Sequence, residues 1–260
     1  MLLAVDVGNS HTVSGVFAGE KLIAEWRFKS DRDRTADEPA IRYHSLFQMA
    51  DIAPGSITGF IVSSVVPTLE TAWMSYADRY LAGKLLSAPI SVNHTTKTDI
   101  TIATDNPSEV GADRIVNSIA ACRRFNPPII VIDFGTAITF DCVNSKKEYV
   151  GGTILPGIGI SLDALSSRTA KLPRVDIETP PQNVIGKNSI DAIRSGILLG
   201  FGGMIDRMAD RIIVELDGGN HEVSIIATGG MAHLIAPYSE HLHIIDPLLT
   251  LKGLKIIFDE

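Results

Sequence analysis

The hydrophobic and polar positions of this chain follow two different spacings, and each spacing predicts a different kind of element. Short apolar or alternating runs predict β-strands, and they fall at residues 2–5, 11–17, 21–28, 59–67, 89–92, 127–135 and 223–230. Runs with helical spacing predict helices, and they fall at residues 41–52, 68–86, 106–120, 161–171, 189–216 and 246–258, with a further helical start at Met231. Because strands and helices are mixed and each half carries hairpin signals, we expect an α/β fold with mixed sheets.

Three segments carry more detailed expectations. In the helix at residues 41–52, the spacing of Ile41, Leu46 and Met49 predicts one shared apolar face. The sequence Asn106-Pro107-Ser108-Glu109 combines an N-cap residue, a proline at the first helical position and a glutamate at the third, so it predicts a helix start. Residues 151–160 are rich in glycine and predict a turn region.

Residues 3–12 resemble residues 130–139 at a constant offset of 127 positions, close to half of the 260-residue chain. The residues that recur are Asp6 and Asp133, Gly8 and Gly135, and Thr12 and Thr139. The repeat indicates either a duplicated unit or two unrelated strand-turn-strand segments, since Asp and Gly are common in turns.

The composition restricts the partners of the chain. With 23 basic and 30 acidic residues the net charge is −7, which argues against nucleic acid as the main ligand. The two cysteines, Cys122 and Cys142, are far apart and form no metal or disulfide pattern, so we expect a reducing cytoplasm. We expect no leader and no membrane segment, because the N-terminus lacks a basic region and no apolar run reaches about 18 residues.

The recurring strand ends suit a phosphate ligand. A strand that ends in Asp-x-Gly places a carboxylate at a tight turn, where glycine lets a phosphate approach successive backbone amides. Two such turns could hold one polyphosphate, with Mg²⁺ or another cation between it and the carboxylates. Gly229 and Gly230, which follow another apolar strand, could admit a base or ribose, or could form a plain strand-to-helix turn.

Five motifs in order resemble the type III pantothenate kinase family, part of the actin-like and sugar-kinase ATPase superfamily. The motifs are Asp6-Val7-Gly8-Asn9-Ser10, Gly111-Ala112-Asp113-Arg114, Asp133-Phe134-Gly135-Thr136-Ala137, Gly151-Gly152-x-Ile154-x-Pro156-Gly157 and Ala227-Thr228-Gly229-Gly230. Further matching pieces are Ser63-Ser64-Val65-Val66-Pro67, Lys171-Leu172-Pro173 and Gly186-Lys187-Asn188-Ser189. The resemblance covers nearly the whole chain.

The resemblance implies two ribonuclease-H-like domains with a nucleotide cleft between them, at residues 1–114 and 115–260, with the last helix able to pack back on the first domain. It implies ATP-dependent phosphorylation of pantothenate to 4′-phosphopantothenate, the first step of coenzyme A biosynthesis. The implied cofactors are ATP, Mg²⁺ and a monovalent cation, K⁺ or NH₄⁺. The implied state is a cytoplasmic homodimer.

The resemblance also assigns site residues. It assigns the nucleotide to Asp6, Val7, Gly8, Asn9, Ser10, His11, Thr12, Val13, Thr136, Gly229 and Gly230. It assigns Mg²⁺ to Asp6 and the monovalent cation to Asp133. It assigns pantothenate to Thr104, Gly111, Ala112, Asp113, Arg114 and Ser189, with Asp113 as the general base. From the residues alone, the aspartates could instead cap turns, and Asp113-Arg114 could be a surface ion pair.

Two positions depart from the family pattern. Thr104 stands where the family often has a tyrosine that touches pantothenate, so an aromatic wall of the pocket is missing. Ser189 stands where the family usually has a threonine that reaches the site of the partner subunit, and a hydroxyl is kept.

Other candidates have simpler explanations. His241 and His243 are expected on one face of an exposed strand, Cys122 and Cys142 among buried apolar residues, and the apolar run 197–205 in a core. Residues 31–34 are expected in a solvated loop. Two other functions stay open at this point: a kinase of the same superfamily with another hydroxyl or acyl substrate, and a nucleotide-binding regulatory protein without transfer activity.

Overall fold

A computed structural model describes residues 1–217 and 222–260, which form two compact units. Unit 1 comprises residues 1–99, 105–120 and 249–260, and unit 2 comprises residues 100–104 and 121–248. The division falls inside helix α3 (Ala112–Arg124). The C-terminal helix belongs to unit 1, although it is separated in sequence from the rest of that unit.

Unit 1 is built on a five-stranded mixed sheet in the order β3-β2-β1-β4-β5. Its strands are β1 (Leu2–Val7), β2 (His11–Ala18), β3 (Lys21–Lys29), β4 (Gly59–Ser64) and β5 (Ile90–Val92). The first three strands are antiparallel neighbours, whereas β4 runs parallel to β1 and β5 runs parallel to β4. Its other elements are α1 (Asp37–Met49), η1 (Pro54–Ser56), α2 (Pro67–Tyr76), η2 (Ala77–Leu81), η3 (Pro107–Glu109) and α7 (Leu249–Asp259).

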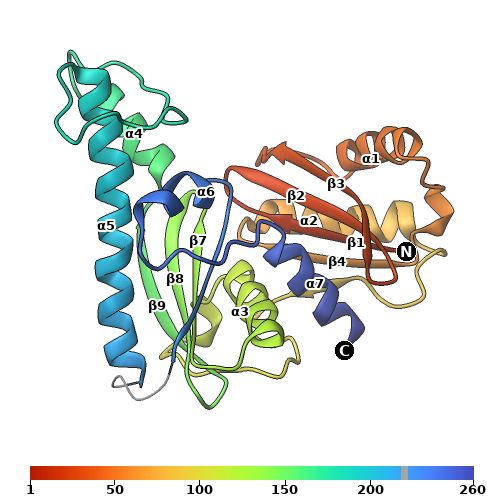
Figure 1. Ribbon diagram of the computed structural model, residues 1–260. Helices are drawn as coiled ribbons and strands as arrows, with labels where there is room; N and C mark the ends of the chain where they lie inside the picture. The colour runs from red at the N-terminus through yellow and green to blue at the C-terminus, as the bar shows by residue number, and fades with distance from the viewer. Residues whose placement is uncertain (218–221) are drawn as a thin grey trace. The chain divides into compact units, whose positions relative to one another are not determined.

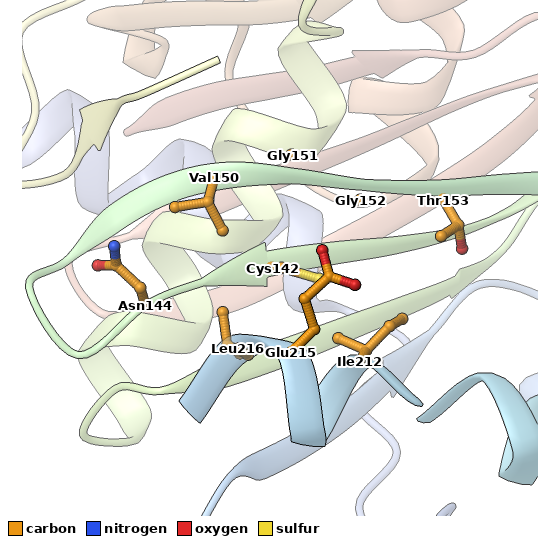
Figure 2. Close-up of a pocket in the computed structure, with 9 residues that line it drawn as sticks. All are labelled: Cys142, Asn144, Val150, Gly151, Gly152, Thr153, Ile212, Glu215 and Leu216. Atoms are coloured by element: carbon orange, nitrogen blue, oxygen red, sulfur yellow. The ribbon is translucent and has the colours of Figure 1, made fainter. Parts of the chain in front are cut away.

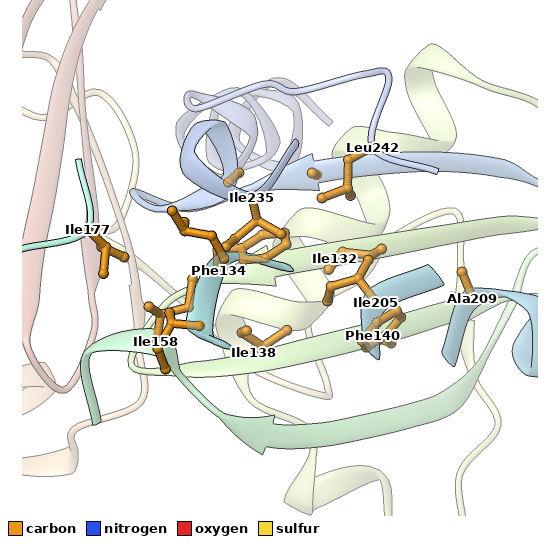
Figure 3. Packing of buried hydrophobic residues seen from close by; sticks show 14 of the residues in the cluster. Ile132, Phe134, Ile138, Phe140, Ile158, Ile177, Ile205, Ala209, Ile235 and Leu242 are labelled. Atoms are coloured by element: carbon orange, nitrogen blue, oxygen red, sulfur yellow. The ribbon is translucent and has the colours of Figure 1, made fainter. Parts of the chain in front are cut away.

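Unit 2 is built on a second five-stranded mixed sheet in the order β10-β7-β8-β9-β6. Its strands are β6 (Thr101–Ile102), β7 (Ile129–Phe134), β8 (Ala137–Val143), β9 (Glu148–Pro156) and β10 (Ser224–Thr228). Its helices are α4 (Ile158–Ser167), α5 (Ser189–Asp217), α6 (Ala232–Ile235) and η4 (Ala236–Tyr238). The long helix α5 runs along the sheet (Figure 1), and the apolar side chains between them form the core of this unit (Figure 3). The predicted α/β fold with mixed sheets is confirmed.

The two sheets repeat one plan. In each, an antiparallel three-stranded meander is extended by a parallel strand beside its first strand, β4 beside β1 and β10 beside β7. Each meander also carries a bulge at the same place, because Ile23 and Val150 have no partner in the neighbouring strand. These two exposed residues are 127 positions apart. A shared irregularity favours duplication over coincidence as the origin of the repeat.

The structure corrects one part of the predicted correspondence. In unit 1 the hairpin closes with Val7 opposite Thr12, whereas in unit 2 it closes with Phe134 opposite Ile138. The second turn is therefore one residue shorter, and Ile138 takes the place of Thr12 while Thr139 takes that of Val13. The buried positions agree with this alignment, because both Thr12 and Ile138 are buried.

The predicted buried face of α1 is wrong. Ile41 is 72% exposed and Met49 is 82% exposed, whereas the buried residues are Pro39, Tyr43 and Phe47, each four positions apart. The ring of Tyr43 lies 5.3 Å from that of Trp73 in an edge-on arrangement and 5.6 Å from that of Phe47. An aromatic cluster buries more apolar area than the aliphatic face could, so it determines the orientation of the helix.

Four further predictions about the elements are also wrong. The capping sequence at Asn106 starts only the single turn η3, because Val110 is extended, and α3 begins later, at Ala112. The glycine-rich segment is largely strand: residues 151–156 belong to β9, and a Cβ at Gly152 would lie 1.7 Å from the Phe140 carbonyl oxygen. The helix predicted to Leu86 ends with η2, at Leu81. No strand forms at the histidine pair near residue 242.

Most other expectations are confirmed. The strands near the N-terminus, the strand before each Asp-x-Gly turn, the long helix at residues 189–216 and the last helix all form close to the predicted bounds. Cys142 is buried on β8, and burial raises the pKa of its thiol to about 12. Within the described ranges, no helix combines the length and apolar character needed to cross a bilayer.

Candidate active site

Asp6 lies at the end of β1, and the parallel pairing with β4 places Ser63 directly opposite it. The Ser63 hydroxyl donates a hydrogen bond of 2.9 Å to Asp6 Oδ1. The same register recurs in unit 2, where β10 places Thr228 opposite Asp133. In each sheet, therefore, an acid on the first strand of the meander has a hydroxyl residue as its neighbour on the parallel strand. Ser63 begins the matching segment Ser63–Pro67 of the sequence analysis. Its contact with Asp6 could be recognised only once the register of β1 and β4 was known.

Asp113 lies in the first turn of α3, which is why Gly111 precedes it. A Cβ at Gly111 would lie 2.5 Å from Asp113 Oδ1, so glycine leaves room for the carboxylate to turn back toward the helix start. The backbone N–H of Arg114 donates a hydrogen bond of 2.8 Å to that same Oδ1. The helix N-terminus thereby holds a carboxylate with a defined orientation.

The charge of Asp113 acts on Asp6 in unit 1. Burial and the Asp113 charge together raise the pKa of Asp6 to about 7, against the Ser63 hydrogen bond, which lowers it. Burial also raises the pKa of Asp113, opposed by the Arg114 backbone hydrogen bond and the Arg114 charge. Two acids with raised pKa values in one place are typical of a functional site, since a purely structural pair would be costly.

The first predicted phosphate turn, residues 8–11, is closed by a hydrogen bond of 3.0 Å from the Gly8 N–H to the His11 carbonyl. Asn9 is exposed at the tip of this turn, and Arg32 donates a hydrogen bond of 3.2 Å to Asn9 Oδ1. The loop at residues 31–34, which was expected only to be solvated, therefore also contacts the turn. Burial, Arg27 and Lys29 lower the pKa of His11. His11 is therefore neutral at pH 7 and adds no positive charge to the turn.

The side chains of Val7 and Thr12 point into unit 1, since both residues are buried. Thr12 Oγ1 lies 3.0 Å from the hydroxyl of Ser30, a residue that the sequence did not single out. The backbone of these two positions can still shape the turn, whereas the Thr12 hydroxyl is already bonded inside the protein. Val13 is half-buried on β2.

The second predicted turn, in unit 2, is closed in the same way, by a hydrogen bond of 3.1 Å from the Gly135 N–H to the Ala137 carbonyl. Two glycines approach it closely. A Cβ at Gly157 would lie 2.2 Å from the Thr136 carbonyl oxygen, and a Cβ at Gly229 would lie 2.5 Å from Asp133 Oδ1. The structure thus brings Asp133, Thr136 and Gly229 together, with Gly230 next in the chain.

Replacement of Gly229 by Ala is expected to lower the free energy of unfolding by about 2–4 kcal/mol, because overpacking and a left-handed backbone both penalise a side chain. The φ of Gly229 is +90°, and its Cβ would also lie 2.6 Å from the Phe134 backbone. Urea unfolding would measure the loss. Gly55→Ala is the matched control, since a Cβ there meets no atom within 4 Å. Equal stability of the two variants would contradict this account of Gly229.

The predicted pantothenate residues are distributed over both units. Gly111, Ala112, Asp113 and Arg114 are consecutive in unit 1, while Thr104 and Ser189 belong to unit 2. Thr104 Oγ1 is buried and finds no hydrogen-bond partner within residues 1–217 and 222–260. Ser189 is exposed at the start of α5, directly after the N-cap Asn188, whose Oδ1 accepts a hydrogen bond of 2.9 Å from the Asp191 N–H.

The arrangement of acidic and histidine side chains limits how a metal ion could be held. No group of three or more His, Cys, Asp or Glu side chains in the described part of the chain is arranged to hold an ion. His241 Nε2 instead lies 3.0 Å from Asp210 Oδ1, an ion pair when the histidine is protonated. A divalent ion at Asp6 would therefore need water or phosphate oxygens as its other ligands, which is the habit of Mg²⁺.

A separate hollow of about 490 Å³ lies in unit 2 between β8, β9 and the end of α5. Figure 2 shows Glu215 and Ile212 of α5 opposite the bulge of β9, where Gly151 and Gly152 contribute no side chains. The hollow exists because Gly151 and Gly152 have no side chains to fill the space between β9 and α5. None of the predicted site residues lines it.

Solved structures define the class of the fold. The chain aligns with a putative 2-dehydro-3-deoxygalactonokinase from Sinorhizobium meliloti at a TM-score of 0.54 and 14% identity, covering 99% of this chain and 98% of that one. It aligns with a conserved putative Baf family transcriptional activator from Campylobacter jejuni at a TM-score of 0.54 and 21% identity, covering 99% and 96%. The fold is that of the actin-like and sugar-kinase ATPases.

Sequence comparisons narrow this class to one family. The family model described as type III pantothenate kinase matches residues 2–211. A type III pantothenate kinase from Desulfotalea psychrophila is 52% identical over 259 residues, which are 99% of this chain and 97% of that protein. The chain belongs to the type III pantothenate kinase family. It is a phosphotransferase for pantothenate, which acts at the first step of coenzyme A biosynthesis, as the resemblance implied.

Proposed function

We propose that the chain phosphorylates pantothenate with ATP through a site in which Asp6, the turn at residues 8–11 and Asp113 act together. The observation that carries this assignment is the pair of acids with raised pKa values, Asp6 and Asp113, next to a glycine turn. The nucleotide residues proposed from the resemblance are the remaining members of the first turn together with Thr136, Gly229 and Gly230. Glycine turns of this kind suit phosphate, because their amides carry positive potential.

In the proposed reaction Asp113 accepts the proton of the primary hydroxyl of pantothenate. The hydroxyl oxygen forms a bond to the γ-phosphorus of ATP while the bond between that phosphorus and ADP breaks. A carboxylate whose pKa is raised toward the working pH is a stronger base than an ordinary aspartate. Arg114, the next residue, is proposed to bind the carboxylate of pantothenate with its planar guanidinium group.

The residues present fit a divalent cation at Asp6. A cation would offset the repulsion that the charge of Asp113 exerts on Asp6, and the Ser63 hydrogen bond involves only one of the two Asp6 oxygens. When bound, Mg²⁺ would neutralise charge on the phosphates of ATP. Asp133 is proposed as the ligand of a monovalent cation, K⁺ or NH₄⁺, because it lies against the backbone of Gly229 with no side chain between them.

Thr104 is proposed to contact pantothenate through its hydroxyl. That oxygen is buried and has no partner in the described residues, so a polar group of the substrate could satisfy it. The contact would replace the aromatic wall that the family often has at this position. Gly111 and Ala112 are proposed as further contacts of pantothenate from the resemblance.

A homodimer is proposed on the exposed face of α5. Ala192, Gly196, Gly200 and Gly203 recur at helical spacing on it, and a Cβ at any of these three glycines would meet no atom within 4 Å. Beside them lies an apolar groove of about 470 Å³ whose lining includes Ser189. A second copy docked there would cover the groove and bring Ser189 toward the partner's site. Sedimentation of the purified protein would test the dimer.

The direct test is an assay with purified protein, ATP, Mg²⁺ and pantothenate. We expect one ADP for each 4′-phosphopantothenate, and a lower rate when Na⁺ replaces K⁺, because the Asp133 site selects among monovalent cations. ADP release with another hydroxyl acceptor but not with pantothenate would contradict the substrate assignment. An unchanged rate in Na⁺ would contradict the cation site alone.

We also propose that the enzyme works in the cytoplasm, and that residues 1–114 and 115–260 act as its two domains.

A further inference from the structure

Ser30 follows β3 and makes three hydrogen bonds to residues of the segment Gly8–Thr12, which contains the first predicted phosphate turn. Its N–H donates to the Ser10 carbonyl at 2.9 Å, and its hydroxyl donates to the Gly8 carbonyl at 2.6 Å. The same hydroxyl lies 3.0 Å from Thr12 Oγ1. Ser30 is 9% exposed, so water competes little for these bonds.

The direction of these bonds is fixed by counting hydrogens. A serine hydroxyl has one hydrogen to donate, and Ser30 gives it to the Gly8 carbonyl. Thr12 must then donate to the Ser30 oxygen, so a chain of two bonds runs from Thr12 through Ser30 to Gly8. This chain of bonds ties the two sides of the turn to the residue that follows the third strand.

Unit 2 provides an internal comparison. Gly157 follows β9 as Ser30 follows β3, 127 positions later, and its N–H donates to the Thr136 carbonyl at 3.2 Å. The backbone bond is therefore shared, but a side chain is excluded there by the Thr136 carbonyl, 2.2 Å from the place of a Cβ. The longer turn of unit 1 leaves room for a side chain, and a hydroxyl occupies that room.

We propose that Ser30 is a positioning residue of the kinase, whose hydroxyl holds the Gly8–Thr12 turn in the conformation that receives the phosphates of ATP. The proposal rests on the proposed function, since it takes this turn as a phosphate site. Ser30 acts through the turn: its hydroxyl hydrogen is donated to Gly8, so it has none to offer a phosphate. Without the hydroxyl, the Gly8 carbonyl and the Thr12 hydroxyl both lose a partner.

The test compares Ser30→Ala with Ser195→Ala. Ser195 is also buried, and its hydroxyl also donates to a backbone carbonyl, that of Val184, at 2.6 Å. We expect Ser30→Ala to weaken the binding of a non-hydrolysable ATP analogue, and to raise the KM for ATP, by about tenfold, the scale of one lost buried hydrogen bond. We expect the KM for pantothenate to stay within about twofold, and amide hydrogen exchange in residues 8–12 to accelerate. Ser195→Ala should change neither constant for ATP.

Two further variants keep the test decisive. Ser30→Thr retains the hydroxyl and should restore ATP binding, and Ser30→Cys keeps the volume with a weaker donor if the alanine variant does not fold. Unchanged affinity and unchanged amide exchange in Ser30→Ala would overturn the proposal, as would equal losses in the Ser195 control. If the wild type binds the analogue but does not phosphorylate pantothenate, the proposed function fails while the Ser30 comparison is still read from binding. If it binds no nucleotide, both fail.

Discussion

Replacement of Asp113 by Asn is expected to lower kcat by about 10³-fold, within the range that a general base contributes. The amide keeps the shape of the side chain and can still receive the Arg114 N–H through its oxygen, so the protein should stay folded. It cannot accept the hydroxyl proton. Steady-state kinetics with ATP and pantothenate would give kcat and both KM values, which we expect to change by less than about threefold because binding groups are retained.

The control for this variant is Asp37→Asn. Asp37 also lies in the first turn of a helix, α1, where it meets Arg79 at 3.0 Å on the surface. This variant removes a carboxylate from a helix start without touching the proposed site, so its kcat should be that of the wild type. Full activity of Asp113→Asn would exclude Asp113 as the base and would leave its raised pKa without a catalytic explanation.

Replacement of Asp6 by Asn is expected to abolish most activity and yet to stabilise the metal-free protein at alkaline pH. The pKa of Asp6 is about 7 in the folded protein against 3.8 ordinarily. Between these values the folded state keeps a proton that the unfolded chain has released, so the free energy of unfolding falls as the pH rises toward 7. The full shift corresponds to at most about 4 kcal/mol, and screening by water reduces it because Asp6 is partly exposed.

The measurement is urea unfolding of the wild type and of Asp6→Asn in the presence of a chelator at pH 5 and pH 8. The stability advantage of the variant should grow by about 2 kcal/mol between these pH values, since most of the Asp6 titration lies there. Asp105→Asn, which changes an exposed aspartate of the same unit, should show no such growth. A wild-type stability that rises across this interval would refute the assigned pKa.

Local sequence signals predicted the elements well, because hydrophobic spacing and turn residues act over a few positions. The strand that ends at Asp6, the hairpin after it and the long helix from Ser189 all follow from such signals. The buried face of α1 does not, because it depends on Tyr43 meeting Trp73, thirty residues further along the chain. The turn predicted at Gly152 is wrong for a similar reason. A glycine in a turn and a glycine in a strand cannot be distinguished from the sequence, and Gly152 is required by the backbone of Phe140, which lies far from it along the chain.

The candidate site likewise contains residues that local sequence patterns predict and contacts that only the fold creates. Asp-x-Gly turns are local, so sequence located both of them, and the family resemblance then supplied roles that await test. The contact between Ser63 and Asp6 depends on strand register, and the Ser30 bonds join residues 18 and 22 positions apart. No local pattern contains such contacts. A serine directly after a strand is common in sequences, so Ser30 could be recognised only from its hydrogen bonds to Gly8 and Thr12.

The composition of unit 1 has a consequence for the order in which the chain folds during synthesis. Helix α7, the last element, packs on β1 and β4, where Gly59 leaves room for Phe258: a Cβ at Gly59 would lie 2.3 Å from its ring. β1 is synthesised before unit 2, and α7 is synthesised after it. The sheet that carries Asp6 therefore waits for residues 249–259, whereas every residue of unit 2 has been made before Leu249. Unit 2 can be completed before unit 1, and a ribosome that stalls before residue 249 leaves β1 and β4 without the helix that packs on them.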